Sequence, residues 1–346
     1  MVRLTGSERK FYQQFSRHGQ GDTLVEIAPQ EVALLTAITH LDLHEGDVPS
    51  WLSQDLYWVA SKPFYEIGPS EVAQLDSRTE FMALEIMREA GIDDLSSPDY
   101  LYLSNLATLY RRRAKYFRIL RQQPFPTADQ VGPRCLLEYG YCESKLLFSW
   151  MSWRKLAFDL DNRSAQETGY LFEPILASCL GGESMGSRNS VVHRLDENGD
   201  PMREGRQIDC YVAATRKVYE LKMRMTIAAS GQGRFGEELS FPREARAAGL
   251  TPVLIVFDPT PSNRLTELRE AYEAAGGDCA IGDTAWDLLK ENAEEGMATF
   301  IDKYIEPPIN AARAGIDGIP GPVTLKATKI GLSISNDAES YEFPRE

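Results

Sequence analysis

The sequence has little that would support a metal cluster, a disulfide framework or a membrane span. Its five cysteines are odd in number, widely separated and form no CxxC pair, so we expect small buried thiols in a reducing compartment. Four histidines in 346 residues favour neither a histidine metal site nor a Ser-His-Asp arrangement. No apolar run approaches the ~20 residues of a membrane span, and the N-terminus lacks a signal-peptide core. We therefore expect a cytoplasmic protein.

Basic residues are also scarce relative to acidic ones. Lysine and arginine total 37 and aspartate and glutamate 51, which gives a formal net charge of −14. This balance argues against a protein that coats nucleic acid. It does not exclude a DNA enzyme, because binding depends on local basic patches more than on the total. The length leaves room for one large or two modest domains.

The most informative stretch, Gly205 to Arg224, is predicted to form a β-hairpin. Its strands are expected at about 207–214 and 218–225, where apolar and polar residues alternate. A period of two places alternate side chains on opposite faces of a strand. One face is apolar enough to pack into a core. The other face carries three charged residues: Asp209, Glu220 and Lys222.

A tight turn at Thr215 and Arg216 would set the register of this hairpin. Asp209 would then lie opposite Lys222, and Tyr211 opposite Glu220. Side chains directly across a ladder are about 5 Å apart, and diagonal ones about 7–8 Å. We therefore expect the three charged groups to converge.

Two carboxylates and a lysine gathered in this way suit phosphodiester hydrolysis. Mg²⁺ typically takes one or two carboxylates and completes its octahedron with water and substrate phosphate. The metal polarises the phosphoryl oxygen and acidifies a bound water, while a lysine can orient that water. The alternative is a cross-strand ion pair between Asp209 and Lys222 on a solvated face.

These residues carry a resemblance to a known family. Asp209, ten intervening residues and then Glu220-Leu221-Lys222 resemble the PD-(D/E)xK nuclease signature, with Ile208 in place of the usual proline. The continuation from Arg224 to Pro242 is similar to type II restriction endonucleases of the ApaLI-like family.

The resemblance implies a catalytic role for Asp209, Glu220 and Lys222, and a Mg²⁺ ion held by Asp209, Glu220 and the Leu221 carbonyl. It implies a bacterial, cytoplasmic homodimer that cuts both strands of double-stranded DNA and leaves 5′-phosphate ends. The narrower match implies a six-base palindrome such as GTGCAC.

Glu173 is a further catalytic candidate. A capping-box pattern at Ser164 predicts the start of a helix, and on that helix Glu173 shares a face with apolar residues. A buried carboxylate is costly and is often functional. In the resembling nucleases, a glutamate on the helix before the sheet adds to the metal site. The alternative is a partly exposed surface acid, and Pro174 must kink this helix or begin another.

The expected DNA contacts come from three places in the chain. The helix predicted from Pro98 to about Gln123 has a basic stretch, which is either a solvated face or a phosphate-contacting surface. The glycine-rich segment after Lys222 is either an ordinary loop or a carrier of groove contacts. Two arginines next to the predicted strands complete the set. The residues are Arg111, Arg112 and Lys115 on the helix, Gln232 and Arg234 in the segment, and Arg188 and Arg224 at the strands.

The expected fold class is α/β (α+β), with a restriction-endonuclease-like α/β/α core and a mixed sheet preceded by a helical N-terminal region. Apolar strands at 188–195 and 251–257 extend the hairpin, and a helix over about 235–248 precedes the second. The expected domains are a mainly helical region for DNA recognition or dimerisation (1–130), a nuclease core (131–310), and a terminal hairpin with an acidic tail (311–346).

Other helices are expected in the first half of the chain. The sequence predicts one helix from Ser70 to Ala90 and another from Arg134 to Phe158, separate from the helix beginning at Ser164.

Two rival functions stay open from the sequence. The same chemistry would suit a structure-specific or modification-dependent nuclease. A non-catalytic DNA-binding module would use the hairpin charges only as an ion pair.

Overall fold

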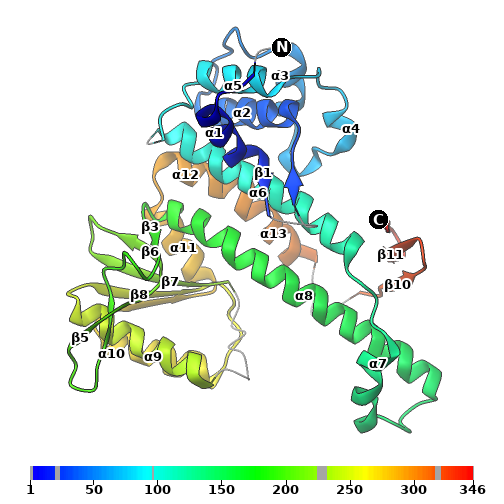
Figure 1. Cartoon of the computed structure of the whole chain (residues 1–346), viewed down its shortest axis with the longest axis vertical. Coiled ribbons are helices and arrows are strands. Elements are labelled where there is room, and N and C mark those ends of the chain that lie inside the picture. Colours follow the sequence, from blue (N-terminus) through cyan, green and yellow to red (C-terminus); the bar gives the residue numbers. More distant parts are fainter. Residues whose placement is uncertain (1–2, 20–23, 96, 224–231, 316–320, 346) are drawn as a thin grey trace. The chain divides into compact units, whose positions relative to one another are not determined.

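The computed structural model describes residues 3–19, 24–95, 97–223, 232–315 and 321–345, without the side chains at 165–171 and 231–234. Two compact units emerge (Figure 1). The helical unit comprises Met1–Thr168 and Pro307–Glu346, and the sheet unit comprises Gly169–Glu306. The two units thus divide the chain at other positions than 130 and 310. The functional roles expected for the domains stay predictions. Within the described ranges, no helix is both long and apolar enough to cross a membrane.

The expected helical N-terminal region is confirmed. α2 begins with Pro29, and the Glu31 carboxylate accepts a hydrogen bond of 2.6 Å from the Ala28 amide, which satisfies one of the unpaired amides of the first turn. α6 is capped by the side chain of the N-cap residue itself, since Ser97 Oγ accepts from the Tyr100 amide at 3.1 Å. The helices and short strands are α1 (Gly6–Ser16), β1 (Arg17–His18), β2 (Val25–Glu26), α2 (Pro29–Leu43), α3 (Gln54–Ala60), the 3₁₀ helix η2 (Phe64–Glu66), α4 (Pro69–Val72), α5 (Glu80–Glu89), α6 (Pro98–Gln122), α7 (Ala128–Val131) and the 3₁₀ helix η3 (Gly132–Leu137).

Two helix predictions in this region were wrong. The single helix expected from Ser70 to Ala90 is two helices, α4 and α5, the second newly capped by the Thr79 side chain. Conversely, the helices expected at 134–158 and from Ser164 are one, α8 (Ser144–Cys179), which continues past Pro174. The capping pattern at Ser164 therefore does not begin a helix, and α8 accommodates Pro174 although proline removes a backbone hydrogen bond and crowds the preceding turn.

The C-terminal residues form a small antiparallel sheet in the order β10-β11-β12. Its strands are β10 (Thr324–Ala327), β11 (Gly331–Ser335) and β12 (Ser340–Pro344), and α13 (Glu306–Gly315) precedes them. The expected terminal hairpin is present, but the acidic segment from 336 is not a free tail. Phe343 is buried with Leu332 and with Leu120 of α6, so apolar burial fixes the last strand.

The sheet unit is built on a five-stranded mixed sheet in the order β3-β6-β7-β8-β9. β6 pairs antiparallel with β3 and β7, whereas β7, β8 and β9 run parallel. This confirms the predicted mixed sheet. The elements are β3 (Glu183–Met185), β4 (His193–Leu195), β5 (Pro201–Gly205), β6 (Ile208–Val212), β7 (Lys217–Lys222), α9 (Gln232–Ala247), β8 (Thr251–Val256), α10 (Asn263–Ala274), β9 (Asp278–Ile281), α11 (Asp283–Asn292), α12 (Glu295–Phe300) and the π-helix η4 (Ile301–Ile305).

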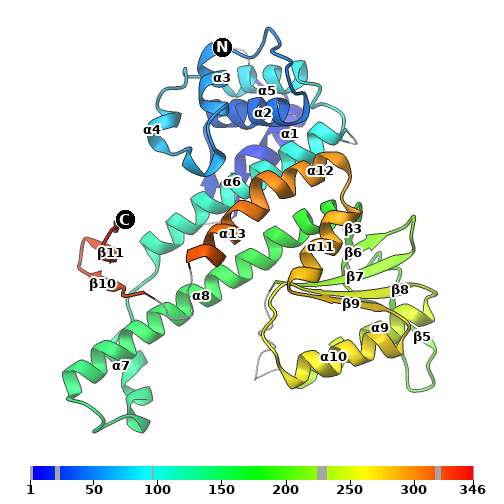
Figure 2. The same ribbon diagram turned by 180° about the vertical axis from the view of Figure 1, so that it is seen from behind.

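Helices cover both faces of this sheet (Figure 2). α9 and α10 lie along one face, where Leu254 and Val256 pack with Phe241 and Tyr272. α11 lies on the opposite side, and the end of α8 contacts that face through Cys210, whose Sγ is 3.9 Å from the Ala177 carbonyl. Nearly all of β8 is buried. Since successive side chains of a strand point to opposite faces, β8 contributes to a core on each side of the sheet, as expected of an α/β/α arrangement.

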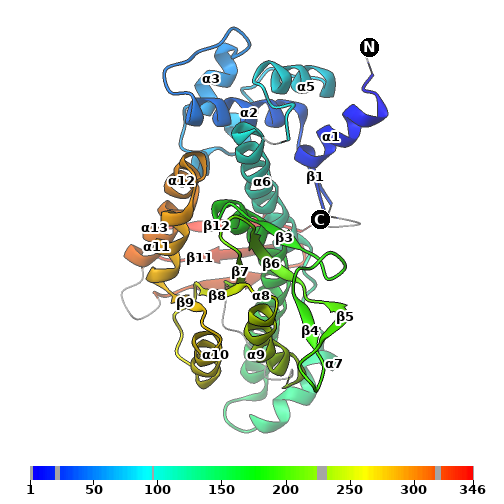
Figure 3. The ribbon, with the colours of Figure 1, turned by 90° about the vertical axis from the view of Figure 1, so that its left-hand side faces the viewer.

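The expected strand at 188–195 is reduced to β4. It pairs with β5 in a two-stranded ribbon outside the main sheet (Figure 3). The strand that borders β6 in the main sheet is instead β3.

The hairpin is present, but its register differs by two residues from the prediction. Cys210 pairs with Tyr219 and Val212 with Lys217, so the turn spans the four residues 213–216 and includes Arg216 at φ 54°. Continuing this register sets Asp209 opposite Glu220 instead of Lys222. A shift of two residues preserves the face of every side chain, so the three charged groups still share one face.

Candidate active site

A cavity of about 480 Å³ opens at the carboxyl end of β7, on the face of the sheet covered by α9 and α10. The hairpin contributes Asp209, Glu220 and Lys222 to its wall. The other lining residues come mainly from the β4–β5 ribbon and the two helices, and include Arg194, Arg206, Glu237, Glu238, Phe241 and Tyr272. The structure therefore brings together the three hairpin residues that the sequence singled out.

Asp209 is the most perturbed acid of the cavity. Burial, together with the nearby carboxylates of Glu220 and Glu173, raises the pKa of Asp209 well above its ordinary value. Its Oδ2 accepts a hydrogen bond of 2.9 Å from the Leu221 amide, which partly offsets this effect. The hydrogen bond ties the acid of β6 to the strand that carries the other two residues.

Lys222 lies between two carboxylates. Its Nζ is 3.2 Å from Glu220 Oε1 and 3.2 Å from Glu238 Oε1. Burial alone would lower the pKa of Lys222, but the two carboxylates outweigh it and raise the pKa above its ordinary value. The ammonium is therefore protonated at neutral pH and can donate protons in hydrogen bonds.

Glu173, on α8, belongs to the same electrostatic group. Burial and then the charge of Glu220 raise the pKa of Glu173, while Lys222 lowers it. The side chain is partly buried. The expectation that Glu173 lies near the hairpin acids thus agrees with its surroundings, and its catalytic role stays a prediction.

The acids of the cavity have the donor chemistry of a divalent-cation site. Among the described residues, no three Asp, Glu, His or Cys side chains lie close enough to hold a metal by themselves. Asp209 and Glu220 nevertheless supply the one or two carboxylates that Mg²⁺ typically takes, and water and phosphate can fill the other positions. The raised pKa of Asp209 beside Glu220 and Glu173 reflects a concentration of negative charge that a cation would relieve. The residues therefore fit a divalent cation.

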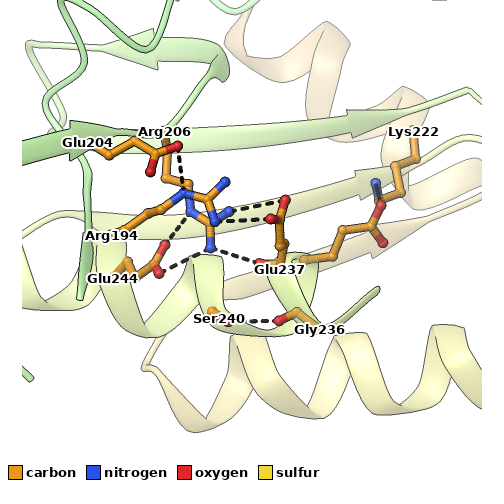
Figure 4. A network of polar contacts seen from close by, with 9 residues as sticks. Arg194, Glu204, Arg206, Lys222, Gly236, Glu237, Ser240 and Glu244 are labelled. Carbon is orange, nitrogen blue, oxygen red and sulfur yellow. Dashed lines mark hydrogen bonds and ion pairs between the residues drawn. The ribbon is translucent and has the colours of Figure 1, made fainter. Parts of the chain in front are cut away.

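A buried ion pair fixes the wall opposite the hairpin (Figure 4). Arg206 donates to both carboxylate oxygens of Glu244, at 2.5 and 3.0 Å, and to the Glu237 carbonyl at 3.2 Å. Arg194 pairs with the Glu237 carboxylate at 3.0 Å. Bidentate arginine–carboxylate contacts add geometric specificity, so α9 is held in a defined position beside β6.

The predicted DNA contacts near the cavity are only partly described. Arg188 is exposed in the segment between β3 and β4. Arg224 lies outside the described residues, as do the side chains of Gln232 and Arg234, whose backbone opens α9. The role of these four residues stays a prediction.

The basic stretch of α6 is used inside the helical unit. Arg111 and Lys115 are only 5% and 4% exposed, and Arg111 donates to the Gln14 and Arg17 carbonyls. Arg112 donates to the Ser164 carbonyl at 3.1 Å, and Arg113 to those of Phe64 and Tyr65. These guanidinium groups are bonded to backbone carbonyls within the helical unit, so neither the solvated-face interpretation nor the phosphate-contacting one describes their positions.

Sequence reasoning missed Glu238 and Arg206. Glu238 stands three residues before Phe241 and seven before Ala245, both buried in the core under α9. This helical spacing predicts that Glu238 lies on the face of α9 that points toward the sheet. No comparable pattern marks Arg206, which pairs with Glu244 across 38 positions of the chain.

Comparison with known proteins gives a consistent result. Residues 68–306 match the model of the ApaLI-like restriction endonuclease family. The chain is also 50% identical over 310 residues to the type II restriction enzyme ApaLI of Acetobacter pasteurianus, covering 86% of this chain and 80% of that protein. No solved structure matches.

Proposed function

Because the chain belongs to the ApaLI-like family of type II restriction endonucleases, and so is a site-specific deoxyribonuclease, we propose that it hydrolyses both DNA strands at the cavity beside β7. Asp209, Glu220 and Lys222 are the proposed catalytic residues. The observation that carries the assignment is that all three line one cavity. The predicted register of the hairpin was wrong by two residues, but such a shift leaves the three side chains on the same face.

Asp209 and Glu220 would hold a Mg²⁺ ion, with the Leu221 carbonyl as a further ligand. A bound Mg²⁺ would polarise the scissile phosphate and acidify a water molecule. The hydrogen bond from the Leu221 amide holds one oxygen of Asp209 in place, which leaves the other oxygen for the cation. Glu173 adds negative charge beside both acids and would strengthen their attraction for a cation.

Lys222 would orient the attacking water and neutralise charge that develops on the phosphate. Glu220 and Glu238 raise the pKa of Lys222 above its ordinary value, which favours the protonated ammonium. We therefore assign it the role of a positioned proton donor and cation, in place of a base that would need to be neutral.

The product ends and the recognised sequence belong to the finer part of the proposal. We infer 5′-phosphate and 3′-hydroxyl ends, and a homodimer, since a two-fold enzyme matches a palindromic site. The 50% identity to ApaLI supports GTGCAC as the first candidate sequence.

The proposed DNA contacts are Arg188, Arg224, Gln232 and Arg234. The first is exposed near the cavity, and the other three flank or open the segment between β7 and α9. We leave Arg111 and Lys115 out because both are buried, and Arg112 because it donates to a backbone carbonyl.

The test is digestion of unmethylated plasmid DNA by the purified protein with Mg²⁺ or with EDTA. We expect discrete fragments only with Mg²⁺, and sequencing of their ends gives the site and the end chemistry. Asp209→Ala and Lys222→Ala should abolish cleavage while the circular dichroism spectrum is retained. Full activity in either variant would refute the assignment, and cleavage restricted to methylated or branched DNA would favour the rival nuclease functions.

A further inference from the structure

The chain from α7 to the early turns of α8 exposes more large apolar side chains than it buries. We propose that this α7–α8 segment, residues 128–156, is the surface through which two copies of the chain associate. Cutting both strands of a palindromic site calls for two cavities of the kind beside β7, and a second copy supplies the other. The assignment therefore rests on the homodimer of the proposed function and names the surface that would form it.

The exposed side chains of the α7–α8 segment are gathered in one place. Val131 at the end of α7 packs with Leu147 and Met151 of α8 (Figure 1), which holds the residues between them together. Leu137 and Tyr141 are 94% and 92% exposed. Apolar residues exposed singly are normal, but a contiguous patch of them marks an interaction surface. The six that are more than half exposed are Leu136, Leu137, Tyr139, Tyr141, Leu146 and Trp150.

The α7–α8 segment also carries an apolar groove of about 340 Å³. One wall is a face of α8, where Phe148, Ser152 and Leu156 recur every four residues, and the other includes Leu325 and Ala327 of β10. A two-fold axis presents the same patch twice, so the interface must be complementary to itself. Side chains that project into solvent beside a groove on the same chain meet this requirement.

Charge in the α7–α8 segment is nearly balanced. Residues 128–156 contain four basic and three acidic side chains, and Arg154 pairs with Glu138 at 2.6 Å. DNA or an anionic membrane would favour an excess of cations. A second copy carries a net charge of −14, so two copies meet with less repulsion at a surface of balanced charge than at an acidic one.

The size of the patch agrees with one half of a dimer interface. A large aromatic side chain carries on the order of 150–250 Å², so six large side chains that are more than half exposed present roughly 800 Å². A stable interface buries about 800 Å² on each partner. Tyrosine and tryptophan, which supply three of the six, are also enriched in the centres of such interfaces.

The test measures mass in solution by sedimentation equilibrium, from micromolar to nanomolar protein. One variant combines Leu137→Lys with Tyr141→Lys, and a second, Ser149→Arg, places a long charged side chain in the groove. Each substituted residue is exposed, and circular dichroism verifies the fold. The control is Leu95→Lys, also at an exposed leucine (63%). Leu95 precedes α6, whose 25 residues span roughly 37 Å before the α7–α8 segment begins.

We expect wild type and Leu95→Lys to have twice the mass of one 38.8 kDa chain at micromolar concentration. The double lysine variant and Ser149→Arg should have the mass of one chain under the same conditions. Their dissociation constants should rise about 30-fold or more, the equivalent of about 2 kcal/mol at a central interface residue. Plasmid cleavage is measured on the same samples, and the two variants should need correspondingly more protein to cut both strands.

Two results would overturn the assignment. Wild type with the mass of one chain at micromolar concentration would show that no dimer forms, and variants that dimerise as wild type does would place the interface elsewhere. If such dimeric variants bind duplex DNA more weakly than Leu95→Lys, the segment contacts DNA instead. The proposed function fails separately: a dimer that dissociates on substitution but cuts no DNA supports the interface and refutes the nuclease activity.

Discussion

The ion pair between Arg206 and Glu244 provides a test of how burial sets the energy of a contact. The two side chains are 10% and 4% exposed, and Nε and Oε2 are 2.5 Å apart. A second pair in the helical unit, Arg17 with Glu26, has nearly the same separation of 2.6 Å, but its side chains are 42% and 57% exposed. The nitrogen–oxygen separation is thus matched while burial differs.

Removing one partner should cost very different amounts at the two places. Glu244→Gln leaves the buried Arg206 guanidinium with only the half-exposed Glu237 carboxylate, 3.7 Å away, as a counter-charge. Removing one partner of a buried ion pair typically costs about 3–5 kcal/mol. Glu26→Gln leaves an arginine that water can solvate, so the expected cost is about 0–1 kcal/mol. Replacing both buried partners by apolar residues, as Arg206→Met with Glu244→Leu, removes the stranded charge and should recover most of the loss.

Urea unfolding at pH 7.5, followed by circular dichroism and tryptophan fluorescence, measures these differences in the free energy of unfolding. The expected order of stability is wild type close to Glu26→Gln, then the double variant, then Glu244→Gln. Equal losses for Glu26→Gln and Glu244→Gln would refute the reasoning from burial. A double variant less stable than Glu244→Gln would show that the pair contributes more than the apolar contacts replacing it.

Three further predictions concern the sheet unit. In EDTA at pH 8, Asp209→Asn should raise the free energy of unfolding, and the gain should shrink toward pH 4. Burial, Glu220 and Glu173 raise the folded-state pKa of Asp209. The wild-type protein therefore loses stability as the pH rises above the pKa of an aspartate in the unfolded chain, about 3.9. Mg²⁺ should raise the melting temperature of wild type but not of Asp209→Asn, by the equivalent of about 2.7 kcal/mol at 100 times the dissociation constant. Gly277→Ala should lower the melting temperature because its Cβ would meet the Pro252 carbonyl, whereas Gly236→Ala, with open space around its Cβ, should not.

The shared face of Asp209, Glu220 and Lys222 was predictable because it depends only on the alternation of side chains along each strand. The turn was expected at two residues and has four, an error that moves the partner of Asp209 from Lys222 to Glu220. Since side chains alternate with a period of two, any even shift leaves the same residues on the same face. A shift of one residue would have buried the charges in the core and destroyed the prediction.

Features that depend on distant contacts were not predictable in this way. The helix start expected at Ser164 was a sound local signal, but α8 runs through it because packing overrides local capping. The C-terminal strand β12 is ordered by Phe343, whose partner Leu120 lies more than 200 positions earlier. The burial of Arg111 likewise depends on the carbonyls of Gln14 and Arg17.

The same cluster of acids that makes the metal-free cavity unfavourable suits it for its proposed chemistry. Asp209, Glu220, Glu238 and Glu173 lie around the ammonium of Lys222, while Arg194 and Arg206 pair with Glu237 and Glu244 of α9. The net charge of −14 adds a long-range field that repels DNA. A bound divalent cation would reduce the local repulsion, because it would neutralise carboxylates and offer positive charge to a phosphate. Without a cation, the two hydrogen bonds between Arg206 and Glu244 hold α9 in position and oppose the repulsion among the carboxylates of the cavity. The arginine–glutamate contacts of α9 and the excess of carboxylates around Lys222 therefore predict that cation binding and DNA binding would favour each other.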